Sequence, residues 1–409
     1  MRSEIEQIVH ILQAVKKINR IIMQSDTIDK GMQSDLLITV EGVNEVLFGN
    51  KILVDYKAYE LLKNMGMQTI TKEQLTDEIA KWCQMVEKKT NDMKDKNNYI
   101  DYEFYSLMNY IEMVPEEIIL EDMKQNFNKV KQYGEQIYYN FVSFFREYKD
   151  FWGDVNPVTG IWDLLYDRLN QLKNHREDFI WLYQELADYR SKMVLNGILQ
   201  YWVKYDFQII QKIKENNYTS YFDLDIVTPD DNEVFVDLGA YTGDSAQDFI
   251  QNMGAYQRIY CYEISKDVFK QLQENMSFYE NITLVNKGVG EAEGIMYLSQ
   301  SEDASANKIT SMGEEAVEIV TLDNDIKEKI TFLKMDIEGA EQQAIKGAAR
   351  HITEEKPKLA ICTYHNNYDI WQIPRMLREM NPNYKLYMRY NGNDAEYEFN
   401  VTEFVTFAT

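Results

Sequence analysis

A glycine-containing bend beside an acidic residue, in the second half of the chain, could hold a small ligand against the backbone. The run Val234-Phe235-Val236 is typical of a buried strand, and Asp237-Leu238-Gly239-Ala240-Tyr241-Thr242-Gly243-Asp244 follows it directly. The spacing D-x-G-x-x-x-G differs from G-x-G-x-x-G, the fingerprint of dinucleotide sites. It therefore favours a ligand without a pyrophosphate.

A second acidic residue, Glu263, stands near the end of the next expected strand, RIYCYEI, twenty-six residues after Asp237. Ligands of open α/β sheets bind at the carboxyl ends of the strands. A carboxylate there can accept hydrogen bonds from the two hydroxyls of a ribose. The bend and Glu263 together predict a nucleoside site, although Glu263 can instead cap the helix expected to begin near Ser265.

The elements that must position these residues form an α/β pattern from about Asn232 onward. Short apolar runs alternate there with helical segments, as in a parallel sheet wrapped by crossover helices. Seven strands suit one doubly wound domain: EVFVDL, RIYCYEI, ITLVNKG, ITFLKMD, KLAICTYH, YKLYMRY and EFVTFA. The polar, turn-rich stretch NNYTSYFDLDIVTPDDN is the expected boundary with the part of the chain that precedes it.

The preceding part, residues 1 to about 220, is predicted to be mainly helical. Its first segment favours an amphipathic helix over a dimerising coil, because coiled-coil spacing is kept over barely three heptads by Ile5, Ile8, Leu12, Val15 and Ile22. The residues around Gly49-Asn50 indicate a small hairpin. The aromatic residues of EQIYYNFVSFFREYKDFW fall at helical spacing and are interpreted as packing rather than as a ligand platform.

The composition argues against several classes of protein. The chain has 409 residues, 45% of them hydrophobic, and only six prolines, so it is globular. Its formal net charge of −24 repels nucleic acid and anionic lipid. Three widely separated cysteines indicate neither a disulfide framework nor a zinc cluster. No run of eighteen apolar residues appears, so we expect no membrane span and a cytoplasmic location.

Several segments of the second half carry a resemblance to a known family. VFVDLGAYTGDS, IYCYEIS and, after TLDN, FLKMDIEGAEQQAIKGA occur in this order, and a KPKLAICTYH strand follows them. They resemble the FkbM family of S-adenosylmethionine-dependent methyltransferases. The recurring K-x-D-x-E-G-A-E segment of that family stands here as Lys334, Asp336, Glu338, Gly339, Ala340 and Glu341. The resemblance covers about Tyr221 to the end of the chain.

The resemblance implies a Rossmann-like, class I methyltransferase sheet of seven strands in residues 221–409, after a mainly helical domain in residues 1–220. S-adenosylmethionine would be the cofactor, held by Asp237, Gly239, Ala240, Tyr241, Gly243, Asp244, Glu263 and Asn286. Of these, Glu263 would bind the ribose and Asn286 would lie near the adenine. Members of the family are associated with O-methylation of sugar hydroxyls in polysaccharides, glycolipids and natural products, so a sugar or glycan acceptor is expected.

Two residues at neighbouring strand ends are candidates for catalysis. Asp336 ends the strand ITFLKMD, at the point of such sheets that faces the transferring methyl group, and His365 ends KLAICTYH. Methyl transfer from a sulfonium is a single displacement, so alignment matters most, and a base that takes the hydroxyl proton helps further. A histidine with a near-neutral pKa suits that task. The base is therefore Asp336 or His365, unless His365 only bonds a backbone group.

No obligatory metal ion is expected. Asp336 would need further oxygen ligands, and the sequence does not bring together the conceivable ones, which are Glu338, Asp303 and Asp369. Glu341 is interpreted as a charge that complements the dipole at a helix N-terminus. Arg389, in Met388-Arg389-Tyr390, replaces a histidine that is usual in the family, and it is expected to offset nearby carboxylates.

The sequence leaves other functions open besides methyl transfer to a sugar. A non-catalytic nucleoside-binding module, acting as a scaffold, is the main alternative. A nucleic-acid methyltransferase is disfavoured by the charge and by the position of Asn381-Pro382-Asn383-Tyr384, and an NAD-dependent dehydrogenase by the glycine spacing. The helical half is expected to cap the acceptor cleft or to form a homo-oligomer. Its last segment, ending in SYFDLDIVTP, is expected over the acceptor side.

Overall fold

The computed structural model describes residues 99–298, 309–310, 315–392 and 402–409, and the chain divides into two compact units, Met1–Ile119 and Leu120–Thr409. The helix expected near the N-terminus and the hairpin expected at Gly49-Asn50 lie outside the described residues. In the first unit, helix α6 (Tyr99–Met113) buries one apolar face that includes Phe104, Met108 and Ile111. Among the described helices, none is long and apolar enough to cross a membrane.

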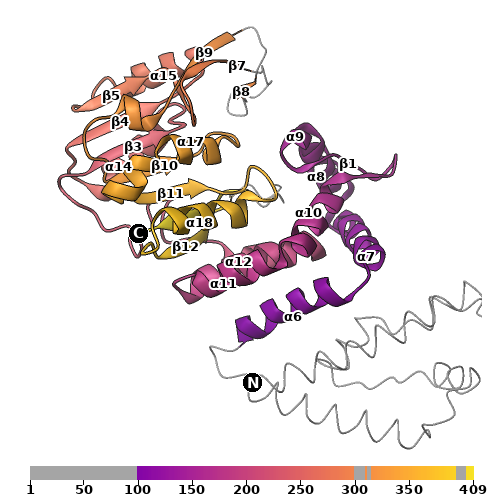
Figure 1. Ribbon diagram of the computed structural model, residues 1–409. Helices are drawn as coiled ribbons and strands as arrows, with labels where there is room; N and C mark the ends of the chain where they lie inside the picture. The colour runs from indigo at the N-terminus through magenta and orange to yellow at the C-terminus, as the bar shows by residue number, and fades with distance from the viewer. Residues whose placement is uncertain (1–98, 299–308, 311–314, 393–401) are drawn as a thin grey trace, which may run out of the picture. The chain divides into compact units, whose positions relative to one another are not determined.

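The second unit contains a sheet of seven strands in the order β12-β13-β11-β10-β3-β4-β5 (Figure 1). All seven expected strands are present, so the predicted α/β architecture is confirmed. Their bounds are β3 Val234–Leu238, β4 Arg258–Tyr262, β5 Ile282–Val285, β10 Phe332–Met335, β11 Lys358–Cys362, β12 Leu386–Tyr390 and β13 Phe404–Ala408.

The sheet is mixed rather than parallel throughout. β3 pairs in parallel with β4 and β10, whereas β13 lies antiparallel to both β11 and β12. The strand order reverses between β3 and β10, because the chain runs outward through β4 and β5 and returns to the other side of β3. Ligands of such sheets bind at this reversal, and both Asp237 and Asp336 belong to the chain there.

Helices and a small second sheet connect the strands. The helices are α14 (Asp244–Met253), α15 (Lys266–Met276), α16 (Leu322–Asp325), α17 (Glu341–Gly347) and α18 (Asp369–Met380), and a π-helix spans His351–Glu355. The second sheet, which the sequence did not predict, has the order β6-β9-β7-β8, with bounds Gly288–Val289, Glu315–Val320, Gly294–Leu298 and Ile309–Thr310. Between the large sheet and α14, Phe235 stacks on Phe249 with ring centroids 4.3 Å apart.

Helices also precede the large sheet; the division after Ile119 falls inside the first of them, α7, and the others belong to the second unit. Their bounds are α7 Glu116–Lys129, α8 Glu135–Glu147, α9 Lys149–Trp152, α10 Asp163–Asn174, α11 Arg176–Glu185, α12 Tyr189–Lys204 and α13 Phe207–Ile213, with a 3₁₀ turn at Val130–Tyr133 and a two-stranded β1–β2 ribbon at Val155–Asn156 and Ile161–Trp162. Of the aromatic residues of α8 that were expected to pack, Phe141 and Phe145 are buried, whereas Tyr139 is 67% exposed.

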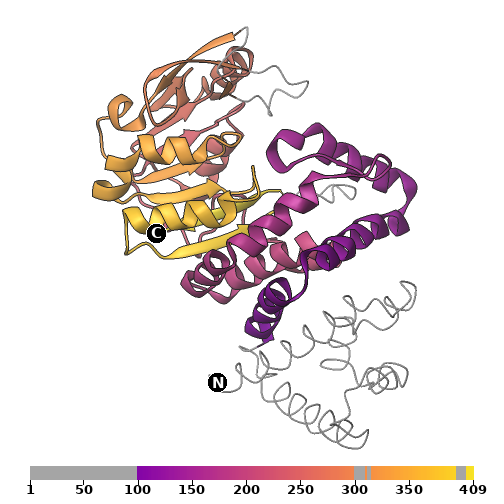
Figure 2. The same cartoon turned by 45° about the vertical axis from the view of Figure 1, so that its right-hand side comes forward.

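Helix α12 lies beside the edge strand β12 (Figures 1 and 2). Asp188 caps the start of the helix by accepting a hydrogen bond from the Ser191 amide at 2.6 Å. The chain on either side of the helix pairs with the strand, through the Ala187 amide to the Leu386 carbonyl and the Glu215 amide to the Tyr390 carbonyl. Helices α8 to α13 belong to the same compact unit as the sheet.

Candidate active site

The bend after β3 is held so tightly that only glycine fits at position 239. Gly239 has a φ of +77°, and a Cβ added there would lie 1.8 Å from the carbonyl oxygen of Asp336. The amides of Gly239 and Ala240 both donate to the Tyr262 carbonyl, at 3.0 and 2.9 Å. The bend is thus wedged between the ends of β4 and β10, which explains its glycine.

Glu263 joins the two loops that follow β3 and β4. Its side chain is 8% exposed, and its carboxylate accepts hydrogen bonds from the Tyr241 amide at 3.1 Å and the Ser265 amide at 2.7 Å. Burial raises the pKa of Glu263 to about 7, although these two amides oppose that shift. Ser265 itself caps α15 by accepting from the Val268 amide. Glu263 therefore supports the residue that caps the helix while it also faces the cavity described next.

A cavity of about 270 Å³ opens at the carboxyl ends of β3, β4 and β10. Of the residues that the sequence assigned to the cofactor, the cavity is lined by Gly239, Tyr241, Asp244 and Glu263. The other four, Asp237, Ala240, Gly243 and Asn286, are not among its lining residues. Asn286 instead donates to the carbonyls of Glu263 and Ile264, and the cavity wall is made by the residues that follow it, Lys287, Gly288 and Val289.

Asp237 lies beneath the bend and is fully buried. It pairs with the Lys334 ammonium at 2.9 Å and accepts a hydrogen bond from the Ser245 hydroxyl. Lys334 in turn donates to the Gly239 carbonyl at 2.7 Å and lines the cavity. Burial raises the pKa of Asp237, although Lys334 opposes the shift. Asp237 thus acts on the bend through Lys334.

Asp336 reaches the cavity from the end of β10, and two tyrosines hold its carboxylate. The Tyr221 hydroxyl donates to Oδ2 at 2.7 Å, and the Tyr364 hydroxyl lies 3.4 Å from Oδ1. Burial alone would raise the pKa of Asp336, but His365 and Lys334 together hold it below its usual value. Asp336 is therefore an anion with a fixed orientation at the cavity wall.

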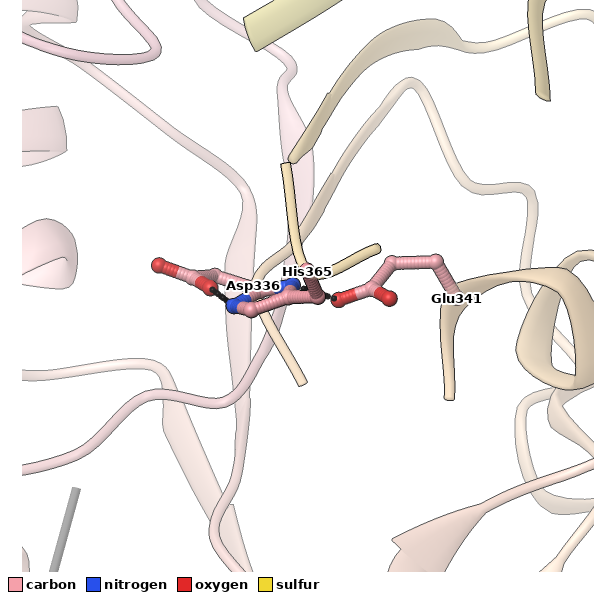
Figure 3. A group of neighbouring side chains, drawn as sticks. All are labelled: Asp336, Glu341 and His365. Atoms are coloured by element: carbon pink, nitrogen blue, oxygen red, sulfur yellow. Dashed lines mark ion pairs between the residues drawn. The ribbon is translucent and has the colours of Figure 1, made fainter. Parts of the chain in front are cut away.

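His365 lies between Asp336 and Glu341 (Figure 3), and a third carboxylate, Glu338, is also close to its ring. Its Nε2 is 3.4 Å from Asp336 Oδ1 and 3.6 Å from Glu338 Oε2, and its Nδ1 is 3.0 Å from Glu341 Oε1. Burial alone would lower the pKa of His365, yet Glu341 and Glu338 raise it well above the usual value. The near-neutral pKa expected from the sequence is thus wrong, because the turn after β10 surrounds this ring with carboxylates. The carboxylates at both ring nitrogens therefore favour the protonated form of His365, which does not line the cavity.

Glu341 is more than a charge at a helix N-terminus. It is fully buried, and its carboxylate accepts a hydrogen bond from the Ile337 amide at 2.9 Å. It fixes both the turn that carries Glu338 and the ring of His365. Together, Asp336, Glu341 and His365 place one potential ligand atom each within 4.8 Å of one another. Because Asp336 and Glu341 face different nitrogens of one ring, the arrangement suits a protonated imidazole, and the expectation of no obligatory metal stays a prediction.

The helical segment also reaches this site. Trp152 at the end of α9 donates from Nε1 to the Tyr364 carbonyl at 2.6 Å, and the ring of Phe151 lies 5.7 Å from that of His365. Tyr221, in the SYFDLDIVTP segment, lines the cavity directly. That segment thus lies against the cavity, as the hypothesis about its position requires.

Sequence reasoning missed Tyr221, Tyr364 and Glu403 as site residues. Each lines the cavity. Tyr221 and Glu403 are far in sequence from the motifs, whereas Tyr364 directly precedes His365. A common backbone feature marks part of the wall: Tyr221, Tyr241, Glu338 and Glu403 all have positive φ, between 46° and 70°. Such conformations are costly for residues other than glycine and concentrate at functional sites. No residue type in the sequence indicates these backbone conformations.

Arg389 does not face the cavity. Its guanidinium is buried and pairs with Asp188 at 2.7 Å and Asp223 at 2.5 Å. It therefore offsets carboxylates, as expected, and it ties β12 to the start of α12 and to the segment before β3.

Comparisons with known proteins agree with this geometry. A family description for the methyltransferase FkbM domain matches residues 237–395. Among solved structures, the methyltransferase FkbM from Methylobacillus flagellatus has 25% identity and a TM-score of 0.50, over 59% of this chain and 62% of that one. This chain thus spans less than two thirds of that relative.

A weaker likeness, with 11% identity and a TM-score of 0.29, links 46% of this chain to 93% of a putative methyltransferase from Streptococcus mutans solved in complex with SAH, and nothing is inferred from it. No match was found among curated proteins. The family match supports S-adenosylmethionine as the cofactor that the motifs indicated. Residues 237–395 of this chain are thus similar to the methyltransferase FkbM domain.

Proposed function

We propose that this protein transfers a methyl group from S-adenosylmethionine to a hydroxyl of a sugar. One observation carries the proposal: within an FkbM domain, the glycine bend, Glu263 and Asp336 meet around one cavity at the reversal of strand order. The sugar acceptor rests on the family resemblance and on this cavity. A role in polysaccharide, glycolipid or natural-product biosynthesis and a cytoplasmic location are part of the same proposal.

The residues present fit this cofactor. Glu263 offers a carboxylate in the cavity wall, and both of its oxygens are held in place by backbone amides, so it can accept hydrogen bonds from ribose hydroxyls without reorganising. The wall also carries Asp244, Asp336, Glu338 and Glu403, and carboxylates attract a cationic sulfonium. When bound, the cofactor supplies an electrophilic methyl group.

The acceptor hydroxyl must be aligned with that methyl group and must lose its proton. Alignment can supply ~7–11 kcal/mol of the barrier, and a positioned base a further factor of ~10²–10⁴. We assign proton acceptance to Asp336, because it lines the cavity and its carboxylate is oriented by Tyr221. His365, protonated behind it, stabilises the charge of Asp336 and is a positioning residue.

Calorimetry and turnover test the proposal together. S-adenosylmethionine and its demethylated product should both bind, and a panel of methyl glycosides should include a sugar that is methylated. Asp336→Asn should abolish most turnover and retain cofactor binding. His365→Gln should lower kcat less than Asp336→Asn does. Binding without turnover on any sugar would favour the alternative, a nucleoside-binding scaffold, and failure to bind would refute both.

The helical segment of the second unit supports a role at the acceptor side. Tyr221, Phe151 and Trp152 bring this segment to the cavity and to the loop after β11. We therefore favour an acceptor cap for the helical segment over an oligomerisation role.

A further inference from the structure

We infer that the acceptor is a sugar without an acidic group beside the methylated hydroxyl, so that uronic acids, sialic acids and sugar phosphates are rejected. This inference rests on the proposed function and narrows its substrate class. Two separate observations carry it: the charge balance of the cavity wall and its inventory of hydrogen-bond donors.

The described wall of the cavity is acidic. Five carboxylates line it, against two lysines: Asp244, Glu263, Asp336, Glu338 and Glu403, with Lys287 and Lys334. Both lysines are paired with carboxylates that lie outside the wall. Lys334 binds Asp237 at 2.9 Å, and Lys287 binds Glu318 at 3.0 Å and Asp325 at 3.4 Å. Their charges are therefore already compensated, so neither lysine is left to balance those carboxylates of the wall that are ionised.

The cation nearest to Asp336 is compensated as well. His365 is protonated, but its Nδ1 faces Glu341, a fully buried carboxylate that does not line the cavity. Negative charge is already disfavoured in this part of the wall, since burial, together with the charge of Asp336, raises the pKa of Glu403 to about 7. A further anion placed among Asp336, Glu338 and Glu403 would meet the same repulsion.

The hydrogen-bond donors around Asp336 are also in use. The hydroxyls of Tyr221 and Tyr364 both point to its carboxylate. The side chains of Asp336, Glu338 and Glu403, when ionised, can only accept hydrogen bonds. A neutral sugar offers several hydroxyl donors to such acceptors, whereas a carboxylate or phosphate substituent requires donors, and the hydroxyls of Tyr221 and Tyr364 are already bonded to Asp336. Charge and hydrogen bonding thus select the same class of acceptor.

Matched pairs of acceptors test this inference. Methyl glucoside against methyl glucuronide, and methyl galactoside against methyl galacturonide, differ only by CH₂OH in place of a carboxylate. We expect kcat/KM for the neutral member to exceed that for the uronate at least tenfold. Glu403→Gln should lower the ratio of kcat/KM for the neutral sugar to kcat/KM for the uronate, because it removes one wall carboxylate. Glu338→Gln serves the same purpose if the first variant does not fold. Glu291→Gln, which alters an exposed ion pair with Lys346, should leave the ratio unchanged.

The outcomes separate the two proposals. Methylation of the uronate as fast as its neutral partner would overturn this inference and leave the proposed function standing. An unchanged ratio in both wall variants would also overturn it, because the wall carboxylates would then not be the cause of selection. If no member of any pair is methylated, the proposed function fails, and this inference fails with it.

Discussion

Replacing Gly239 by alanine tests whether the bend after β3 positions Asp336. The new Cβ would lie 1.8 Å from the Asp336 carbonyl oxygen, whereas real Cβ contacts are essentially never closer than 3.0 Å. The oxygen would have to retreat by about 1.2 Å. It cannot do so alone, since the Asp336 amide donates to the Leu238 carbonyl at 3.0 Å. The clash should therefore displace the end of β10, and with it the Asp336 carboxylate to which Tyr221 donates a hydrogen bond.

Two contributions make up the expected loss of stability. Alanine at a positive φ costs ~1–2 kcal/mol, and overpacking adds ~1–3 kcal/mol. Gly160 provides a matched control, because its φ of +78° is nearly that of Gly239 and an added Cβ meets nothing within 4 Å. Gly160→Ala should show the first contribution alone. A displacement near 1 Å at a reacting group can cost ~100-fold in rate, so Gly239→Ala should also lower kcat by about that factor.

Urea unfolding followed by tryptophan fluorescence would measure the midpoints of both variants, and calorimetry would measure their affinity for S-adenosylmethionine. We expect Gly239→Ala to unfold at clearly lower urea than Gly160→Ala and to bind the cofactor less tightly. If the two variants unfold together and Gly239→Ala binds and turns over like the unaltered protein, the bend does not position the site.

Four further predictions concern other residues of the site and the fold. Tyr221→Phe should lower kcat by about 10- to 100-fold, because a hydrogen bond to a charged group is worth ~1.5–3 kcal/mol, and it should leave the affinity for the cofactor unchanged. The control is Tyr256→Phe, which removes a hydroxyl bonded to the Glu280 carbonyl. Equal effects of the two substitutions on kcat would contradict the role of Tyr221. Ionised Glu263 is the form that binds the ribose, so with a pKa of about 7 the calorimetric affinity for S-adenosylmethionine should rise about tenfold from pH 6 to pH 8. Glu263→Gln should flatten that profile, and an unaltered slope in this variant would assign the titration to another group. Arg389→Leu should cost ~3–5 kcal/mol in urea unfolding, since it leaves the buried Asp223 unpaired, and a loss below ~1 kcal/mol would refute that reasoning. Turnover should be undiminished in a chelator, and activity that returns only with added magnesium would show that a metal ion is required.

The large sheet could be predicted because each of its strands is a short apolar run bounded by turn residues. Val234–Leu238 and Phe332–Met335 are buried at every position, as parallel strands covered on both faces should be. The direction of β13 could not be predicted, since Phe404–Ala408 is also buried throughout and suits either direction. The second sheet was missed because its strands are short or partly exposed, as at Ile295 in β7, which is 60% exposed.

The site was predictable where one motif supplied both the residue and its surroundings. Gly239 and Glu263 belong to neighbouring strand ends, so their meeting follows from the order of strands. Tyr221 reaches Asp336 across 115 positions of the chain, and nothing in either segment indicates that contact. The raised pKa of His365 depends on Glu341, which the turn after β10 brings within 3.0 Å. Electrostatic surroundings of this kind arise from folding and leave no local pattern in the sequence.

The pairing of α12 and its flanking residues with β12 bears on how this protein could be divided or recombined. A fragment that began at the FkbM domain would leave backbone amides and carbonyls of the edge strand β12 unpaired, and unpaired edge strands promote self-association. The fragment would also lack Asp188, so the guanidinium of Arg389 would lose one of its ion-pair partners. A chimera with a different helical segment would therefore have to replace β12 as well, because the two are joined by backbone hydrogen bonds and by the Arg389 ion pairs.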